Sequence, residues 1–326
     1  MAWAILIILA IVAAGIGFYN FMQGETLVRD VIDEIRLHRA DIHALDAAWA
    51  ANPNRSDCVV SLTSLPSRLP YIDSTLKSLM RQDKAPARIR LNLPYFSKRE
   101  GKPYEVPAWL EKLQSVELIR CEDFGPATKL IPSVTGLPQD QKIIVVDDDR
   151  IYPASLIADL DAAATRSPDA AMGLGGWVVP GDLIDRKTTV LSSTLMRPPA
   201  PLHAIRLRKP RPVDILQGLA GFLVRPRFFD LNALTDYTQA PQAAFFVDDV
   251  WISAHCVAPK YVIPVRRAGH VLHRRRKFYW NTGLGLANRG DGNPNNNKNT
   301  IVIQHFAGRW RVGGLQAGKR QTGRGD

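Results

Sequence analysis

The sequence predicts an α/β fold, with a Rossmann-like, mostly parallel central sheet flanked by helices and preceded by an N-terminal transmembrane helix. In Lys142–Pro153, four β-branched residues run directly into three aspartates. This apolar run is too short for a typical helix and predicts a strand buried on both faces, as in a parallel sheet. A strand, a polar loop and a helical apolar stripe follow one another over Cys58–Met80, as in the opening unit of an α/β domain. Residues 1–24 carry no charged side chain.

Composition allows a large folded region and argues against some classes of site and partner. The chain has 326 residues, of which 46% are hydrophobic, enough for one large domain or two small ones. Cys58, Cys121 and Cys256 are widely spaced, which argues against a disulfide framework or a zinc site and is compatible with a reducing compartment. A net charge of +11 suits nucleic acid, anionic lipid or a phosphorylated substrate. We expect no nucleic-acid partner, because no zinc finger, RNA-recognition signature or heptad repeat is present.

The uncharged segment 1–24 is long enough to cross a bilayer as a helix, which takes about 20 residues. The alternative is a cleaved signal peptide, which would need a basic start and a shorter apolar core. We predict an uncleaved, single-pass anchor. Arg29, Arg36 and Arg39 follow the span and no Lys or Arg precedes it, so the positive-inside rule places the rest of the chain in the cytoplasm. Residues 25–55 predict an amphipathic helical stalk or packing helix, with apolar residues at roughly helical intervals.

The other predicted elements alternate between strands and helices. In the first half they are strands at Cys58–Thr63, Ile89–Leu93 and Val116–Ile119, a helix at Leu69–Met80 and a short helix within Tyr104–Leu113. In the second half they are a helix at Leu156–Ala164, a Gly-rich strand and turn at Ala171–Trp177, a mobile loop at Pro180–Pro212, a strand-like segment at Val213–Val224, a flexible loop at Asn288–Asn299 and a strand at Ile301–Phe306.

Asp147, Asp148 and Asp149 form the first candidate site. Two charges about 4 Å apart repel by about 4 kcal/mol at an effective dielectric constant of ~20. A divalent cation such as Mg²⁺ or Mn²⁺ would remove this repulsion, and ligands of open α/β sheets bind beyond the carboxyl ends of the strands. Strand periodicity puts Asp147 and Asp149 on one side and Asp148 on the other. The alternative is a solvated acidic loop.

Two earlier positions offer groups that suit a phosphate. Thr63 and Arg68 belong to the polar loop after the first strand, and Arg suits a phosphate or a planar base. Lys129 follows a Gly-Pro turn and precedes the central strand. Lys129 suits contact with a diphosphate, and a solvent-exposed lysine on the surface is an equal alternative. Further on, Arg266–Lys277 is strongly basic and predicts a solvated face, a surface for anionic headgroups at ~1 kcal/mol per residue, or a site for a phosphorylated lipid-linked acceptor.

Three segments resemble a glycosyltransferase of the GT-A fold, of the family 2-like, nucleotide-sugar-dependent kind. They are Val-Val-Ser-Leu-Thr-Ser from Val59, Gly-Pro-Ala-Thr-Lys-Leu from Gly125 and Ile-Ile-Val-Val-Asp-Asp-Asp from Ile143. The resemblance covers roughly Asp57–Phe306. It implies that Asp147 and Asp149 hold Mn²⁺ or Mg²⁺ on the diphosphate of a nucleotide sugar, typically a UDP-sugar. It also implies that Thr63, Arg68, Lys129, Asp147 and Asp148 lie near the nucleotide.

The resemblance extends to Phe245–Ser253, where Asp248 and Asp249 match the superfamily's later acidic motif, which opens a helix and supplies a catalytic base in inverting enzymes. A sugar hydroxyl must lose a proton as it attacks, and a carboxylate within hydrogen-bond reach accepts that proton. We favour Asp249 over Asp248. The alternative is helix capping, since Asp is common in a first helical turn. A late His often completes the metal or phosphate site in such enzymes, and His305 is the candidate, followed by His270 and His273.

Together these features predict a membrane-anchored, metal-dependent hexosyltransferase-like enzyme that moves a sugar from a nucleoside-diphosphate sugar to a glycan or lipid-linked acceptor. The expected domains are an anchor at 1–24, a stalk at 25–55, a catalytic domain at 56–310 with its nucleotide-binding half at 56–150 and its acceptor half at 151–310, and a disordered basic tail at 311–326. Membrane lipid is the other expected partner. The rival hypotheses are a metal-dependent nucleotidyl- or phosphotransferase on a similar sheet, and a non-catalytic binding module at the membrane.

Overall fold

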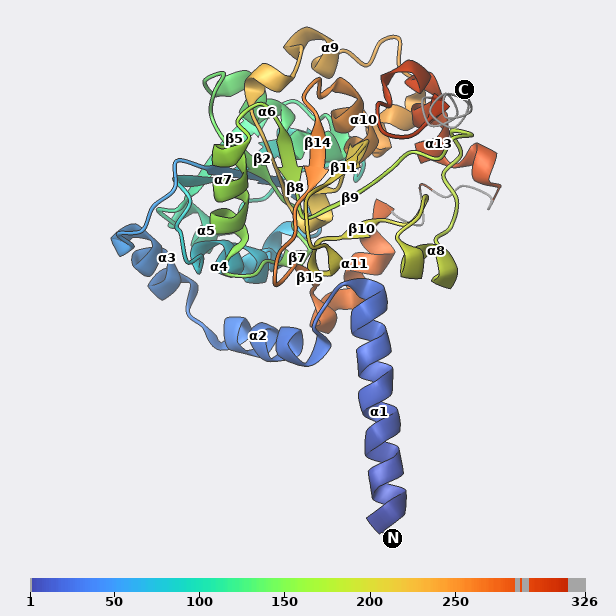
Figure 1. Cartoon of the computed structure of the whole chain (residues 1–326). Helices are drawn as coiled ribbons and strands as arrows, with labels where there is room; N and C mark the ends of the chain where they lie inside the picture. The colour runs from blue at the N-terminus through green and yellow to red at the C-terminus, as the bar shows by residue number, and fades with distance from the viewer. Residues whose placement is uncertain (1, 285–287, 289–292, 316–326) are drawn as a thin grey trace, which may run out of the picture.

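The computed structural model describes residues 2–284, 288 and 293–315. Within these residues the chain forms a central eight-stranded sheet with helices around it, and a long N-terminal helix projects from one end (Figure 1). The α/β prediction with a mostly parallel central sheet is confirmed. The start of the basic tail, 311–315, is described, but residues 316–326 and four residues of the predicted flexible loop Asn288–Asn299 lie outside the described residues.

The sheet combines a parallel half with a mixed half. The order is β11-β14-β8-β13-β6-β1-β2-β5. β1 pairs in parallel with both β2 and β6, and β2 pairs in parallel with β5. β13 runs antiparallel to its neighbours β6 and β8. The strands are β1 (Val59–Thr63), β2 (Arg88–Pro94), β5 (Val116–Cys121), β6 (Ile143–Val145), β8 (Ala171–Gly173), β11 (Arg211–Val213), β13 (Phe222–Val224) and β14 (Lys260–Val262).

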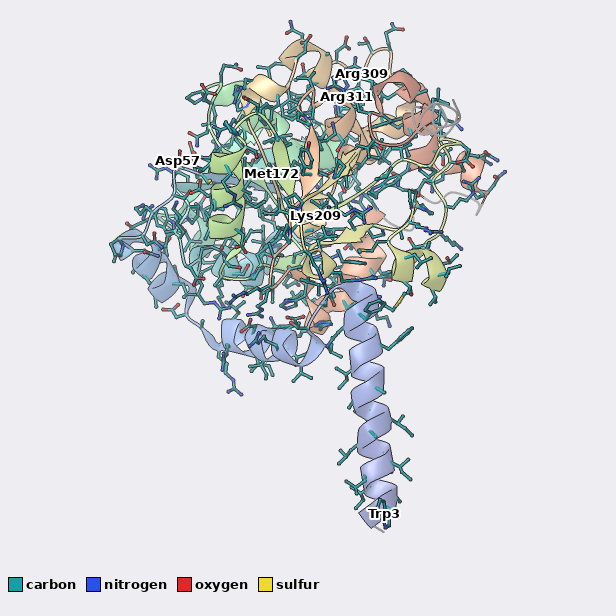
Figure 2. The ribbon with its side chains drawn as sticks, in the orientation of Figure 1. Trp3, Asp57, Met172, Lys209, Arg309 and Arg311 are labelled. Carbon is teal, nitrogen blue, oxygen red and sulfur yellow. The ribbon has the colours of Figure 1, made fainter. Side chains whose placement is uncertain are left out.

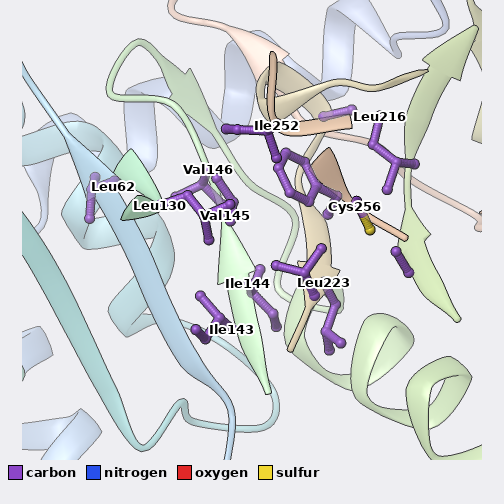
Figure 3. Packing of buried hydrophobic residues seen from close by; sticks show 14 of the residues in the cluster. Leu62, Leu130, Ile143, Ile144, Val145, Val146, Leu216, Leu223, Ile252 and Cys256 are labelled. Atoms are coloured by element: carbon purple, nitrogen blue, oxygen red, sulfur yellow. The ribbon is translucent and has the colours of Figure 1, made fainter. Parts of the chain in front are cut away.

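The predicted central strand is β6, which lies between β1 and β13. Its three residues and Val146 are completely buried, as expected of a strand covered on both faces. Figure 3 shows these side chains packed between Leu62 of β1 and Leu223 of β13. Burying an aliphatic side chain of this size contributes about 1.5–3 kcal/mol. The core therefore fixes where the strand ends and where the aspartates begin.

Most elements predicted for the first half are present with shifted ends. The strands at Ile89–Leu93 and Val116–Ile119 are β2 and β5, each slightly longer than predicted. The helix predicted at Leu69–Met80 divides into a 3₁₀ turn at Leu69–Tyr71 and the helix α4 (Asp73–Met80). The short helix predicted within Tyr104–Leu113 is α5 (Ala108–Glu111). In the second half, the helix predicted at Leu156–Ala164 is α7 (Leu156–Arg166).

The strand predicted at Ile301–Phe306 is wrong, because this segment belongs to the helix α13 (Lys298–His305). The β-branched run Ile301-Val302-Ile303 favours a strand by local preference. Asn297 caps the helix instead, its side chain accepting from the N–H of Asn299. Thr300, Val302 and Ile303 are then buried on the domain, so tertiary packing overrides the local preference.

The segment Pro180–Pro212, predicted as a mobile loop, contains regular structure. The helix α8 (Val190–Leu195) begins with a capping box between Thr189 and Ser192. β10 (Leu202–His203) then pairs with β9 (Gly175–Trp177), which also pairs with β12 (Ile215–Leu216). The segment is therefore tied to a second, three-stranded sheet at both of its ends.

The N-terminal helix α1 (Ala2–Gln23) stands away from the domain. Among the described residues it is one helix long and apolar enough to cross a membrane, over Trp3–Gln23. Figure 2 shows its side chains projecting on all sides, with Trp3 at the far end. Its last turn meets the domain, where Glu25 accepts from the hydroxyl of Tyr19 over 2.9 Å and lies 3.6 Å from the Arg150 guanidinium.

Residues 25–55 form two helices that pack on the domain rather than a free stalk. They are α2 (Leu27–Arg39) and α3 (Ile42–Ala51), and Asp41 between them caps α3. Asp46 of α3 accepts from the backbone N–H groups of Gln114 and Ser115, both over 2.8 Å. The buried indole of Trp49 donates to the carbonyl of Pro86 over 3.0 Å. The helix α3 therefore packs on the domain through Asp46 and Trp49, whereas α2 buries Asp30, Asp33, Glu34 and Leu37.

Candidate active site

Two acidic segments from distant parts of the sequence meet at one edge of the sheet. Asp147–Asp149 follow β6, and Asp248 and Asp249 open the helix α10 (Asp248–His255). Because β1 and β6 are parallel, their carboxyl ends share this edge with Thr63. All five carboxylates and Thr63 line a cavity of about 940 Å³, measured with its open mouth. The predicted position of ligands beyond the strand ends therefore matches the cavity.

Lys129 joins the two acidic segments. It ends the 3₁₀ turn at Gly125–Lys129, and its side chain is 6% exposed. Its ammonium nitrogen lies 2.6 Å from Oδ1 of Asp147, 2.5 Å from Oδ2 of Asp248 and 3.7 Å from Oδ1 of Asp249. Burial alone lowers the pKa of Lys129, but the three carboxylates outweigh it and hold the pKa well above its usual value. Lys129 is therefore a permanent cation in the centre of the acidic cluster.

Arg68 is the second buried cation and holds the other aspartates of the first segment. Its Nη1 lies 2.9 Å from Asp148 and 3.5 Å from Asp149. Its Nε donates to Oγ1 of Thr282 over 3.0 Å, and its Nη2 donates to the carbonyl of Tyr279 over 3.2 Å. All three nitrogens are thus engaged by the protein. Arg68 holds Asp148 and Asp149 and contacts the helix α11 (Arg276–Thr282), and it also lines the cavity.

Asp249 faces the cavity and has the properties of a base. Its side chain is 27% exposed, and its Oδ1 accepts from the backbone N–H of Gly218 over 3.0 Å. Burial, followed by the charge of Asp248, raises its pKa from 3.8 to about 7. Asp248 is only 13% exposed and lies closest to Lys129. Of the two carboxylates, Asp249 is the more exposed and lies farther from Lys129.

The pKa of Asp149 is raised in the same way as that of Asp249. Burial and the neighbouring Asp148 raise its pKa from 3.8 to about 6, against the opposing effect of Arg150. Its side chain is 26% exposed and lies 4.0 Å from the Arg150 guanidinium. In the described part of the chain, the cluster holds five carboxylates against three cations within 4.0 Å, namely Lys129, Arg68 and Arg150. Arg150 also pairs with Glu25 over 3.6 Å, so the carboxylates outnumber the cations that neutralise them.

The carboxylate oxygens of the cluster are also suitable ligands for a hard divalent cation. Carboxylate oxygens suit Mg²⁺ and Mn²⁺, and Mg²⁺ commonly binds through one or two carboxylates together with phosphates and waters. Asp147 and Asp149 both face the cavity. Among the described residues, no third acidic, Cys or His ligand completes a ready cluster with them. Waters and phosphate oxygens of a substrate would have to complete the coordination.

A different acidic group has metal-ligand spacing, but its own surroundings argue against a metal. In the described residues it consists of Asp57, Cys58 and Asp161. Lys142 pairs with both carboxylates, and Lys84 lies 2.5 Å from Asp161. Burial raises the pKa of the Cys58 thiol to about 12, so this thiol is neutral beside two carboxylates that lysines already neutralise. This group is an ion-pair network that ties β1 to α7.

The structure does not bring the predicted histidine ligands to the carboxylates. His305 is exposed, packs against the ring of Phe306, and lines neither cavity beside the aspartates. Its charge acts on His255 at the end of α10, roughly 10 Å along the helix from Asp248. The expectation for His305 depended on the strand that proved to be α13. His270, the next candidate, faces Asp30 of α2, with 3.6 Å between them.

Thr63 lines the cavity, but its hydroxyl already donates to the carbonyl of Asn92 over 2.7 Å. Sequence reasoning gave no role to Gly218 and Tyr152. The hydroxyl of Tyr152 accepts from the N–H of Asp147 over 2.9 Å and donates to the carbonyl of Gly218 over 3.3 Å. A Cβ on Gly218 would lie 2.8 Å from Oδ1 of Asp147, so a larger residue there would displace the ends of the Asp147 and Lys129 side chains. The glycines of Val213–Val224 suggested a close backbone approach, and Gly218 makes it to the cluster itself.

A second cavity, of about 1770 Å³ with its mouth, adjoins the first through Asp147 and Asp149. From these carboxylates it extends to Tyr19 and Gly24 at the end of α1. Arg276, also in its lining, contributes positive charge. The acidic cluster is therefore reachable both from the cavity beside β1 and from the side of the N-terminal helix.

No family model and no curated protein matches this sequence. Solved structures share its general arrangement at low identity. TarS of S. aureus (residues 1–349) has a TM-score of 0.41 and 11% identity, over 68% of this chain and 62% of TarS. GalNAc-T7 with UDP, GalNAc and Mn²⁺ has a TM-score of 0.42 and 13% identity, over 64% and 41%. 4-Diphosphocytidyl-2C-methyl-D-erythritol synthase has a TM-score of 0.36 and 13% identity, over 64% and 88%.

These neighbours comprise GT-A-type glycosyltransferases and a nucleotidyltransferase. TM-scores below 0.5 with identities of 11–13% carry no argument about the fold family or the activity of this chain. The activity of this chain has to be argued from its own residues.

Proposed function

We propose that this protein is a membrane-anchored, metal-dependent glycosyltransferase that moves a sugar from a nucleoside-diphosphate sugar, with UDP as the nucleotide tested first, to a lipid-linked acceptor. The observation that carries the proposal is the meeting of Asp147 and Asp149 with Asp249 in one cavity around Lys129. One pair of carboxylates suits a cation on a diphosphate, and the third suits a base. Glycosyl transfer needs both within one site.

Asp249 is the proposed base. The acceptor hydroxyl gives its proton to Asp249 while its oxygen forms a bond to the anomeric carbon, and the bond from that carbon to the diphosphate breaks. The pKa of Asp249, raised to about 7, matches a base that works near neutral pH. The N–H of Gly218 fixes the carboxylate, with its donor 3.0 Å from Oδ1. Asp248 stays paired with Lys129 and orients it.

Asp147 and Asp149 are the proposed metal ligands. A divalent cation bound there would neutralise the charge that develops on the leaving diphosphate. Lys129 contributes a second positive charge at the same edge of the sheet, 2.6 Å from Asp147. Asp148 does not take part directly, because Arg68 and the hydroxyl of Ser64, 2.5 Å away, hold it inside the protein.

The second cavity supports a lipid-linked acceptor over a soluble glycan. It leads from Asp147 and Asp149 to the end of α1, the helix we propose as the membrane anchor. An acceptor held in a bilayer would bring its head group to the site along this path. Arg29, Arg36 and Arg39, which follow α1, support a cytoplasmic catalytic domain. A carboxy-terminal reporter active only outside the cytoplasm would overturn that orientation.

The test uses the full chain in nanodiscs with a panel of nucleotide sugars, starting with UDP-sugars, and Mn²⁺ or Mg²⁺. Release of free nucleoside diphosphate is measured with lipid extracts as acceptor. We expect D147A, D149A and D249N each to lower turnover by at least about 100-fold, the size typical of losing a general base or a charge-stabilising group. Asp236→Asn, an exposed aspartate outside the cavity, is the matched control.

Other products identify the rival activities. Pyrophosphate in place of nucleoside diphosphate would show nucleotidyl transfer and would overturn the proposal. Calorimetry that detects neither nucleotide nor Mn²⁺ binding to the full chain would leave a non-catalytic membrane module. Full activity of D147A or D149A in a chelator-sensitive assay would disprove the metal assignment.

A further inference from the structure

The helix α2 is amphipathic, but it buries its acidic face and exposes its apolar face, the reverse of a surface helix on a soluble protein. Its buried positions are Asp30, Asp33, Glu34 and Leu37, which recur at helical spacing along one face. Three of these four are acidic. The opposite face consists of Val28, Val31, Ile32 and Ile35, which are 56%, 37%, 44% and 47% exposed. A surface helix in water normally turns its apolar stripe to the core and its charges to the solvent.

The acidic face is held against the domain by cations of the basic run. Asp33 lies 2.6 Å from the Arg267 guanidinium, and Glu34 accepts from the backbone N–H groups of His273 and Arg274, both over 2.9 Å. Leu37 joins a small apolar cluster with Leu272 on the same side. These contacts fix the rotation of α2 about its axis. The apolar face therefore points outward because the acidic face is specifically bound.

The outward face lies where the N-terminal helix leaves the domain. α2 begins four residues after α1 ends at Gln23, and it runs across the axis of α1 beneath the domain (Figure 1). The helix α8, which contacts α1, also exposes apolar side chains: Val190 and Leu191 are 60% and 68% exposed. Apolar surface thus gathers around the end of the candidate span, which itself is not buried inside the protein.

We propose that α2 lies in the interface of the bilayer that α1 crosses, with Val28, Val31, Ile32 and Ile35 buried at the boundary of headgroups and acyl chains. Helices of this kind bury their apolar face ~5–10 Å deep and place basic residues among anionic headgroups. Arg29, Arg36 and Arg39 are exposed on α2 and would be attracted to an anionic membrane. The proposal depends on α1 as a membrane anchor and is independent of the reaction in the cavity.

The occupant is a lipid bilayer rather than a second protein, for two reasons of position and charge. A bilayer that contains α1 reaches the plane where α1 meets the domain, and α2 starts within four residues of that plane. The apolar face is flanked by arginines, and the acidic residues of α2 are turned away from them, since Asp30, Asp33 and Glu34 face the domain. Exposed cations beside an apolar stripe match anionic lipid.

The test places an environment-sensitive fluorophore on α2 of the full chain in nanodiscs. Ile35→Cys carries the label, and Val257→Cys is the control because Val257 is also exposed and apolar, at 54%. Val257 precedes β14, which runs in the same direction as β6, so it lies at the sheet edge opposite to Asp147. The native Cys58 and Cys256 are buried, and Cys121→Ser removes the third thiol.

We expect brominated acyl chains to quench the label at position 35 by about twofold or more and the label at 257 hardly at all, as for a side chain below the headgroups. Ile32→Cys should repeat the result, so that one badly tolerated variant does not decide it. Arg36→Glu with Arg39→Glu should reduce the quenching at 35 in anionic nanodiscs more than in neutral ones. Equal and weak quenching at 35 and 257 would overturn the proposal. So would disulfide cross-linking of two unlabelled I35C chains, which would identify a second copy as the occupant.

Discussion

Nζ of Lys129 donates to Oδ1 of Asp147 over 2.6 Å, so the carboxylate proposed as a metal ligand already carries a protein cation. The same ammonium group reaches Asp248, and it thereby links the end of β6 to the start of α10. A metal bound to the cluster and the ammonium group of Lys129 would both neutralise the same excess negative charge of the carboxylates. Removing either cation should therefore change how strongly the cluster responds to the other.

Lys129→Met should destabilise the metal-free protein and increase its response to Mn²⁺. Removing one partner of a buried ion pair costs about 3–5 kcal/mol, because the remaining charges stay buried. Mn²⁺ should therefore raise the melting temperature of K129M more than that of the wild type, while turnover falls. Lys112→Met changes an exposed lysine and should leave the stability of the metal-free protein, its response to Mn²⁺ and its turnover unchanged. An identical Mn²⁺ response in K129M and wild type would contradict the shared role.

Gly218→Ala should reduce activity by at least about 10-fold by pushing Lys129 and Asp147 apart, since a misplaced catalytic group can cost about 100-fold. The added Cβ would lie 2.8 Å from Oδ1 of Asp147 and closer still to the ammonium of Lys129. Gly308→Ala is the control, because a Cβ there meets nothing within 4 Å. Turnover and melting temperature are measured together, and a wild-type rate in G218A would show that the close approach is unimportant.

Arg68→Lys should release α11 while keeping the charge beside Asp148. Lys lacks the planar fork that lets Arg68 reach Asp148, Thr282 and Tyr279 at once. Hydrogen exchange of the α11 amides should speed up in R68K. Arg186→Lys alters an exposed pair with Asp182 and serves as control. Unchanged exchange in α11 would mean that other contacts hold this helix.

Asp249 should make the metal-free protein less stable as pH rises. Its pKa is raised from 3.8 to about 7 on folding, so between these values the folded state keeps a proton that the unfolded state has lost. Stability therefore falls with rising pH across this window. Buried His255, with its pKa lowered to about 4, gives the opposite trend below about pH 6.5.

The informative quantity is consequently the difference between D249N and wild type, measured in chelator at about pH 5 and about pH 8, on either side of the raised pKa. We expect D249N to gain a few degrees of melting temperature relative to wild type at the higher pH and little at the lower. Asp236→Asn should show no such difference between the two values of pH. A pH-independent effect of D249N would place its pKa near the ordinary value.

The elements that local pattern could predict are those whose side chains are buried for local reasons. β6 was predicted because Ile143–Val146 are all apolar and β-branched, and the structure buries every one. The start of α10 at Asp248 was predicted from the later acidic motif and is confirmed. The helix α13 was missed because its apolar run favours a strand and only the cap at Asn297 with the packing of Thr300 decides otherwise.

The ion pairs of the site could not be predicted, because they depend on contacts between residues far apart in the sequence. Lys129 was expected to meet either a diphosphate or solvent, and it contacts aspartates from two segments. Arg68 was expected to lie near the nucleotide, as a group that suits a phosphate or a planar base. Its guanidinium group contacts four protein residues. No sequence spacing relates Arg68 to Thr282. For the same reason α2 was recognised as amphipathic, but which of its faces meets the domain could not be known.

Glu25 links the proposed membrane anchor to the proposed active site. It joins Tyr19 of α1 to Arg150, the residue directly after Asp149. A transmembrane helix tilts when the hydrocarbon layer is thinner than its apolar length. Tilting of α1 would pull, through Glu25, on the Arg150 guanidinium, one residue away from the proposed metal ligand Asp149. Turnover should therefore depend on acyl-chain length even when substrate and metal are saturating, which would make the thickness of the host membrane a regulator of catalysis.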